Sequence, residues 1–212
     1  MPVADLKLQT LLERTAPDAI APLLAPFVAG RAEVEMTRLQ PPNCYWVVYR
    51  AGGLRITVKC FFSQEEYRLY TGKLADIYGP RVGDPRHVLG GLVLVPELNA
   101  VIWSLPFDPA MPDLHRCLDV DWISAAARLR GDSERLLADI ISYDPEVGAA
   151  IAYRDGPTQR IKLYGRASPE ATSGLTWLAL SRLQQSAAVR DGELRVPRPL
   201  AFRPEAGLLL HA

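Results

Sequence analysis

The sequence predicts an α+β fold made of two tandem units, each an antiparallel sheet with one packed helix. Two observations lead to this prediction. Residues 44–50 and 54–62 are rich in β-branched and aromatic side chains and flank Ala51-Gly52-Gly53, which indicates a β-hairpin. The order of three strands, a helix and two strands then occurs twice along the chain.

In the first half, apolar residues at helical spacing between positions 5 and 29 predict two short helices, interrupted by Pro17 and Pro22. Ser63 with Glu66 three positions later is typical of a capping box, so a helix is expected from there to about Tyr78. Three further strands are predicted at 34–39, 92–95 and 100–105, and a second helix is predicted at 114–129.

In the second half, Ser168 is the expected N-cap of a helix that has Pro169 at its first position and ends near Ala188. Five strands are predicted around it, at 136–143, 148–154, 158–164, 196–203 and 207–211. As a repeat signature, Val47-Val48-Tyr49-Arg50 parallels Ile141-Ser142-Tyr143-Asp144. The predicted division is a helical segment at 1–30, a first unit at 31–130 and a second at 131–212; two unrelated α+β pieces remain the alternative.

The composition excludes several classes of protein. Lys plus Arg and Asp plus Glu both number 24, so no basic excess points to nucleic acid. The three cysteines have no CxxC spacing, which favours a reducing compartment, and no metal-site spacing is evident. The N-terminus lacks the features of a signal peptide, and no apolar run has membrane-spanning length. We therefore expect a cytoplasmic protein that binds neither nucleic acid nor membrane.

The predicted order of elements is that of the small lobe of kinase folds. In that lobe a lysine on the third strand contacts the nucleotide phosphates, a glutamate on the next helix orients it, and a turn covers the phosphates. The matching residues in the second unit are Lys162, Glu170 and the turn at Asp144, Pro145 and Glu146. A solvated strand lysine and a helix-dipole carboxylate are the simpler explanations.

The first unit offers a weaker set of candidates. Lys59 holds the matching place on its third strand, and Glu65 and Glu66 lie on the helix that follows. Its neighbours at even spacing, Thr57 and Phe61, give this face of the strand a mixed character. A structural role for Lys59 is therefore favoured over a second nucleotide site.

Four stretches resemble the N-terminal region, including the small ATP lobe, of the aminoglycoside phosphotransferase and choline kinase-like family. They are ISYDPEVGAAIAYR, QRIKLYG, RVPRPLAFRPEAGLLLHA and, upstream, LVPELNAVIWSLPFDPAMPDLHRCL. The resemblance implies ATP and Mg²⁺ as cofactors and phosphorylation of a hydroxyl acceptor. The turn at 144–148 lacks the basic residues that are common after the Pro-Glu pair in this family.

The family's catalytic segment, a His-Gly-Asp-like loop, has no counterpart in these 212 residues. The resemblance therefore predicts the N-terminal part of a kinase-like phosphotransferase that is inactive alone. Its expected partner is the C-terminal lobe of the same protein, or another protein. The alternative is a non-catalytic protein-binding or regulatory module with a doubled kinase-lobe fold.

Overall fold

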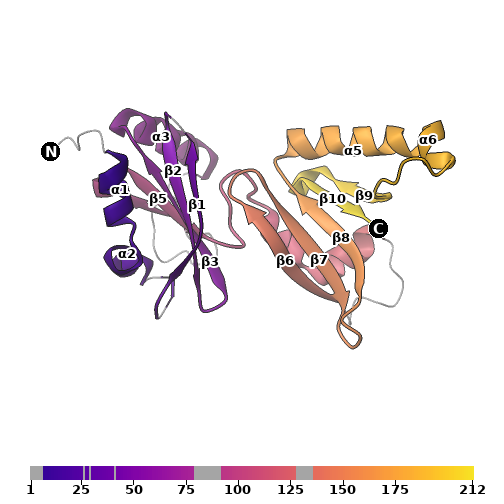
Figure 1. The fold of residues 1–212 in the computed structure, drawn as a ribbon, viewed down its shortest axis with the longest axis horizontal. Helices are drawn as coiled ribbons and strands as arrows, with labels where there is room; N and C mark the ends of the chain where they lie inside the picture. Colours follow the sequence, from indigo (N-terminus) through magenta and orange to yellow (C-terminus); the bar gives the residue numbers. More distant parts are fainter. Residues whose placement is uncertain (1–6, 26, 29, 41, 79–91, 128–135) are drawn as a thin grey trace. The chain divides into compact units, whose positions relative to one another are not determined.

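The computed structural model describes residues 7–25, 27–28, 30–40, 42–78, 92–127 and 136–212 (Figure 1). The chain divides into two compact units, Met1–Phe107 and Asp108–Ala212. The predicted boundary at 130/131 lies outside the described residues. Residues 108–127, which the sequence assigned to the first unit, group with the second.

The first unit contains a five-stranded sheet in the order β1-β2-β3-β5-β4, with every neighbouring pair antiparallel. Its strands are β1 (Glu33–Gln40), β2 (Cys44–Ala51), β3 (Leu54–Phe61), β4 (Leu92–Val95) and β5 (Ala100–Ser104). The predicted hairpin is present as β2 and β3, which pair along their whole length.

The second unit repeats this order as β6-β7-β8-β10-β9, again antiparallel throughout. Its strands are β6 (Leu136–Asp144), β7 (Gly148–Asp155), β8 (Ile161–Ala167), β9 (Pro199–Arg203) and β10 (Leu208–His211). The α+β fold with two antiparallel sheets and associated helices is therefore confirmed.

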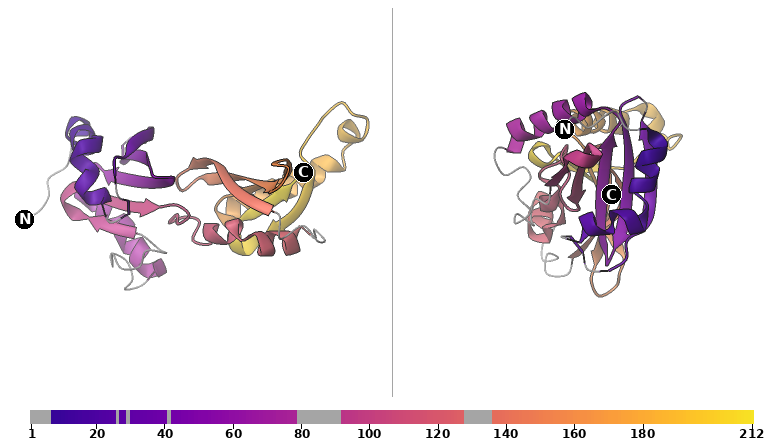
Figure 2. Two further views of the ribbon diagram at one scale, coloured as in Figure 1. Left: turned by 90° about the horizontal axis from the view of Figure 1, so that it is seen from below. Right: turned by 90° about the vertical axis from the view of Figure 1, so that its left-hand side faces the viewer.

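Helices cover both faces of the first sheet, as the views in Figure 2 show. Helices α1 (Leu8–Arg14) and α2 (Pro17–Leu24) pack Leu11 and Ile20 against one face. Helix α3 (Gln64–Tyr78) packs Tyr67 and Leu74 against the other. The predicted cap is present, because the Ser63 hydroxyl accepts a hydrogen bond of 3.1 Å from the Glu66 N–H.

The second sheet is also covered on both faces. A 3₁₀ helix, η4 (Leu114–Leu118), and helix α4 (Val120–Ala126) replace the single helix expected at 114–129, whose last two residues lie outside the described part. The Tyr153 hydroxyl donates to the Cys117 carbonyl at 2.8 Å and fixes η4 to this face. Helix α5 (Glu170–Gln184) contacts β9 and β10 from the other face, and the short α6 (Ala187–Arg190) follows it.

The predicted Ser168 cap of α5 is wrong. Pro169 occupies the N-cap position, and no side chain caps the helix. Ser168 is buried, and its N–H donates to the Gly207 carbonyl at 3.1 Å, so it extends the strand pairing instead.

The connection between the last two strands is the same in both units and shows which of their residues are equivalent. A 3₁₀ turn joins the last two strands in each, η3 (Pro96–Leu98) and η6 (Pro204–Ala206). Each turn ends at a left-handed residue, Asn99 (φ 46°) or Gly207 (φ 55°), whose carbonyl accepts an N–H from the end of the third strand. The match of 47–50 with 141–144 is wrong, since these segments belong to the second strand of one unit and the first strand of the other.

Two glycine substitutions test the units independently. A Cβ at Gly207 would overlap the Ser168 carbonyl in a left-handed conformation, so Gly207→Ala should destabilise the second unit by at least ~2 kcal/mol. A Cβ at Gly72, within α3, would meet nothing, so Gly72→Ala should stabilise the first unit by up to ~1 kcal/mol. Urea unfolding followed by amide hydrogen exchange would measure both changes. Equal effects of the two substitutions would contradict the packing described.

Candidate functional site

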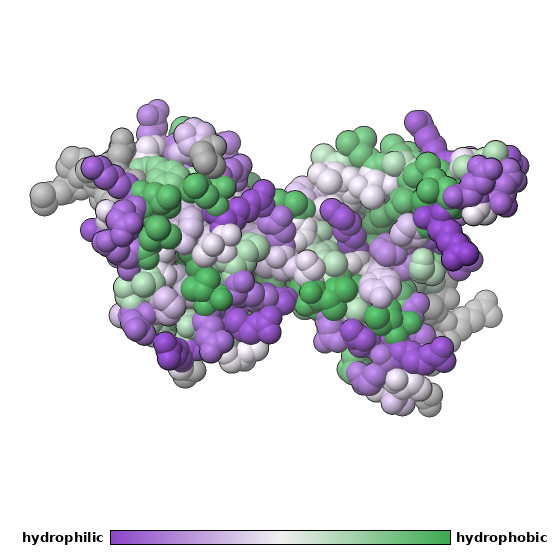
Figure 3. Space-filling model, viewed as in Figure 1, coloured by the Kyte–Doolittle hydropathy of each residue, from purple (hydrophilic) through white to green (hydrophobic). Residues whose placement is uncertain are grey.

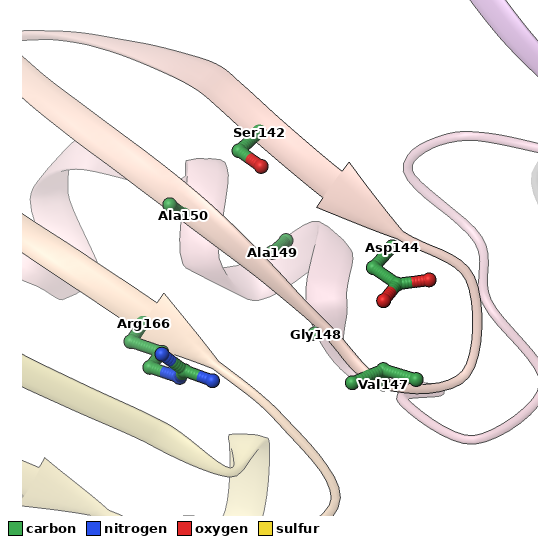
Figure 4. Close-up of a pocket in the computed structure, with 7 residues that line it drawn as sticks. All are labelled: Ser142, Asp144, Val147, Gly148, Ala149, Ala150 and Arg166. Carbon is green, nitrogen blue, oxygen red and sulfur yellow. The ribbon is translucent and has the colours of Figure 1, made fainter. Parts of the chain in front are cut away.

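A hollow of about 160 Å³ lies beside the β6–β7 hairpin turn (Figure 4). Ser142 and Asp144 project into it from β6, and Arg166 projects from β8. Small residues of β7, Gly148, Ala149 and Ala150, and the turn residue Val147 complete the lining. The volume suits one phosphate or carboxylate group, because pockets that enclose a drug-sized ligand are about 300–1,000 Å³.

The turn at the rim of this hollow has a defined backbone shape. Pro145 precedes Glu146, which adopts a left-handed conformation (φ 59°), and the Val147 N–H donates to the Asp144 carbonyl at 3.1 Å. A proline followed by a residue of positive φ is the arrangement of a tight β-turn. Pro145 and Glu146 therefore shape the turn through their backbones.

A buried carboxylate holds the β6–β7 turn in place. Asp108 is fully buried and accepts hydrogen bonds from the Tyr143 hydroxyl at 2.7 Å, the Glu146 N–H at 2.9 Å and the Ala110 N–H at 2.8 Å. Burial raises the pKa of this carboxyl, while the hydrogen bonds from Glu146, Tyr143 and Ala110 act in the opposite direction. Sequence reasoning missed Asp108, because two of its three partners, Tyr143 and Glu146, are 35 and 38 residues away.

The hydrogen bonds that hold this turn in place occupy the backbone N–H groups that a phosphate-covering turn would need. Pro145 has no N–H, the Glu146 N–H is bonded to Asp108, and the Val147 N–H is bonded to Asp144. Backbone N–H groups that converge on an anion are the usual basis of phosphate loops. Residues 145–147 therefore offer no amide to a phosphate group in this conformation.

Lys162 and Glu170 do not form the expected partly buried pair, since both residues are exposed. The strand begins later than predicted, because the Asp155 carboxylate accepts from the Thr158 N–H at 3.2 Å and from its hydroxyl, and the turn extends through Arg160. Lys162 is thus the second residue of β8, five residues before Ala167, the end nearest the hairpin turn. That distance is about 16 Å along a strand, so the expectation that Lys162 lies under the turn is wrong.

The strand register identifies Arg166 as the cation at the site. Cys60 pairs with Ala100 and Ala167 pairs with Leu208, each partner being the first residue of its strand. The preceding residues, Lys59 and Arg166, are therefore equivalent, and sequence spacing had matched Lys59 to Lys162 instead. The Arg166 side chain is exposed and has no hydrogen-bond or ion-pair partner among the described residues.

Lys59 has a structural environment in the first unit. Its ammonium lies 4.0 Å from the ring centre of Tyr70 and 4.4 Å from that of Trp46, and the residue is 6% exposed. Such contacts stabilise a desolvated ammonium by about 2 kcal/mol. Glu65 is exposed and Glu66 half-buried at the start of α3. This enclosure by aromatic rings supports the structural role favoured from the sequence.

The residue that pairs with each cation on the neighbouring strand differs between the two units. Trp46 pairs with Lys59 across β2 and β3, and Ala150 takes the equivalent place beside Arg166. The indole fills the space next to Lys59, whereas a methyl group leaves the floor beside Arg166 open. Farther along this face, Tyr164 stacks on His211 at 5.8 Å and 21°, and burial lowers the pKa of the imidazole.

Two further findings bear on ligands. In the part of the chain that the structure describes, no group of three His, Cys, Asp or Glu residues could hold a metal ion. No helix there is long and apolar enough to cross a membrane.

Comparisons with known proteins add no assignment. A scan against protein-family models and searches of curated proteins and solved structures found no match to this chain. The resemblance to the phosphotransferase family therefore remains a prediction.

The anchoring role of Asp108 can be measured. Asp108→Ala should lower the free energy of unfolding of the second unit by about 3 kcal/mol or more, because it leaves three buried donors without an acceptor. Tyr143→Phe, which removes one donor, should cost ~1 kcal/mol. A smaller loss for Asp108→Ala than for Tyr143→Phe in urea unfolding would show that the carboxylate does not hold the turn.

Proposed function

We propose that this chain is the nucleotide-contacting region of a kinase-like phosphotransferase, with the second unit as its ATP lobe. The observation that carries the proposal is the strand order of the second sheet, with α5 inserted between its third and fourth strands. The first unit has the same order, but aromatic side chains fill the equivalent space there.

The open half of the second sheet is where a nucleotide would bind. Ser142, Ala150, Tyr164 and Arg166 share one face of β6, β7 and β8, as the register pairs of these strands require. Helix α5 contacts β9 and β10 and leaves this half exposed. A planar base can approach a strand closely where the side chains of the strand are small, and Gly148 and Ala150 of β7 provide such a place.

Arg166 is the proposed phosphate contact, in place of Lys162. A guanidinium presents several donors in a plane and binds phosphate by charge-assisted hydrogen bonds. Asp144 at the other side of the hollow limits how much negative charge the site accepts, which favours one phosphate group over a fully enclosed triphosphate. Among the described residues no group of three His, Cys, Asp or Glu side chains could hold a metal ion, so the proposal concerns the nucleotide alone.

A second candidate is a non-catalytic protein-binding module with the same topology. The engaged amides of residues 145–147 and the exposure of Lys162 and Glu170 favour it, since these were the groups expected to hold the phosphates. The two candidates differ in one measurable property, which is nucleotide affinity.

Nucleotide binding should depend on Arg166 and not on Lys162. We expect ATP to bind the chain weakly, and Arg166→Ala to reduce the affinity by about fivefold or more through loss of a charge-assisted contact. The matched control is Lys162→Ala on the same strand, which should leave the affinity unchanged. Chemical-shift titration with ATP, and separately with inorganic triphosphate, would measure both. Absence of any nucleotide binding would overturn the proposal in favour of the binding module.

We expect no acceptor-dependent release of ADP by residues 1–212 with aminoglycosides, choline or sugars. A nucleophile-orienting Asp and a positioned metal supply most of the catalysis of phosphoryl transfer, and the sequence has no counterpart of that loop. A coupled ADP assay with each acceptor tests this. Turnover that requires the acceptor and disappears in Arg166→Ala would show a complete active site.

A further inference from the structure

Two aromatic side chains lie side by side on the open face of the second sheet. The Tyr164 phenol stacks on the His211 imidazole, with ring centres 5.8 Å apart and ring planes inclined by 21°. Tyr164 is 36% exposed, so its ring meets solvent as well as its neighbour. Burial lowers the pKa of His211, so the imidazole is uncharged at neutral pH and serves as a second flat, neutral ring. We call this pair the Tyr164–His211 platform.

The equivalent positions of the first unit are buried. The strand register places Thr57 and Trp103 where the second unit has Tyr164 and His211. Both residues are 0% exposed, and Trp103 packs in one apolar cluster with side chains of α3. Packing therefore explains the aromatic residue of the first unit, whereas the aromatic pair of the second unit stays accessible to a ligand.

The platform adjoins the hollow at the β6–β7 turn. Tyr164 and Arg166 share one face of β8, two positions and about 7 Å apart along the strand. Arg166 and Ala150 line the hollow, which therefore lies on this side of the platform. Figure 1 shows β6, β7 and β8 in front of α4, and Figure 3, drawn from the same side, shows hydrophilic and hydrophobic residues mixed over this region. A ligand that covers both places needs a flat ring at one end and an anionic group at the other.

A second stacked pair in the same unit lacks the neighbouring cation. Trp177 of α5 stacks on Phe202 of β9, with ring centres 6.1 Å apart and ring planes inclined by 19°. The described residues that line the space beside this pair include Glu170 and no lysine or arginine. A carboxylate repels a phosphate group, whereas the guanidinium of Arg166 attracts one. Charge therefore makes the Tyr164–His211 platform, and not the pair on α5, suitable for an aromatic ligand that carries a phosphate.

We propose that the Tyr164–His211 platform stacks the base of a nucleoside monophosphate, whose phosphate contacts Arg166 in the hollow. This inference rests on the proposed nucleotide-binding function and adds that the site recognises one flat ring and one phosphate group. Every base has a flat face, and stacking on aromatic side chains tolerates all of them, so the site accepts different bases. Because the hollow suits a single phosphate, AMP should bind about as tightly as ATP.

NMR titrations of the full chain with AMP and with ribose 5-phosphate separate the two contacts. The protons of the bound adenine should shift upfield, because they lie over the Tyr164 ring. Tyr164→Leu should abolish this shift and weaken AMP binding at least ~5-fold through loss of stacking. It should leave the binding of ribose 5-phosphate unchanged, which also shows that the variant is folded. Tyr164→Phe keeps the ring and should retain the shift and the affinity, and the matched control Trp177→Leu should alter neither.

The possible results distinguish the platform from the proposed function. Equal affinity of the wild type and Tyr164→Leu for AMP, with ATP binding still weakened by Arg166→Ala, would overturn the platform and leave the proposed function standing. A loss from Trp177→Leu as large as that from Tyr164→Leu would overturn the platform as well. Absence of binding by both AMP and ATP would overturn the platform together with the proposed function.

Discussion

The candidate site depends on one buried carboxylate. Asp108 joins the segment that enters the second unit to the end of β6 and to the apex of the hairpin turn. Moving a carboxylate out of water costs several kcal/mol of free energy unless hydrogen-bond donors replace the water. The burial of Asp108 is therefore possible only because of its three hydrogen bonds. The turn is fixed as a result, and β7 begins with Gly148 and Ala150 at the floor of the hollow. The same bonds engage the turn amides, which makes the turn a rigid rim and not a mobile cover.

The two units use one backbone plan with different side chains. The shared parts are the strand order, a 15-residue helix and the 3₁₀ turn with its left-handed residue. In the first unit Trp46, Phe61 and Tyr70 surround Lys59, and the cation stabilises the core. In the second unit Ala150 stands in place of Trp46, and the cation at the same register position, Arg166, faces an open floor. A difference in side-chain volume thus separates a structural cation from one that can meet a ligand.

Local patterns predicted the fold well and the site poorly. The β2–β3 hairpin and the Ser63 cap were predictable because their signals lie within a few residues of each other. The position of Lys162 was not, since it depended on Asp155 extending a turn by its side chain and delaying the start of β8. Asp108 gave no signal, because two of its three partners are 35 and 38 residues away. The sequence does contain a Pro-Glu pair at 96–97 and 204–205, the equivalent turns of the two units, but the same pair also stands at 145–146 and 169–170, so it could not align the units by itself.

The same exchange of side chains changes the sheet face that lies on the side of each helix. Helix α3 packs on a sheet face that carries Trp46, Phe61 and Trp103, so the large side chains of the helix and the sheet bury each other. The face opposite α5 has Ala150 where Trp46 stands, and it offers little apolar volume beyond Leu209 and Phe202. An apolar side chain that is not buried forgoes about 1.5–3 kcal/mol of stabilisation, and both helices carry such residues, Leu69 and Ile77 on α3 and Leu175 and Leu178 on α5. The small residues that open the hollow therefore also reduce the apolar surface that this face of the second sheet offers, whereas the aromatic residues of the first sheet fill the equivalent space.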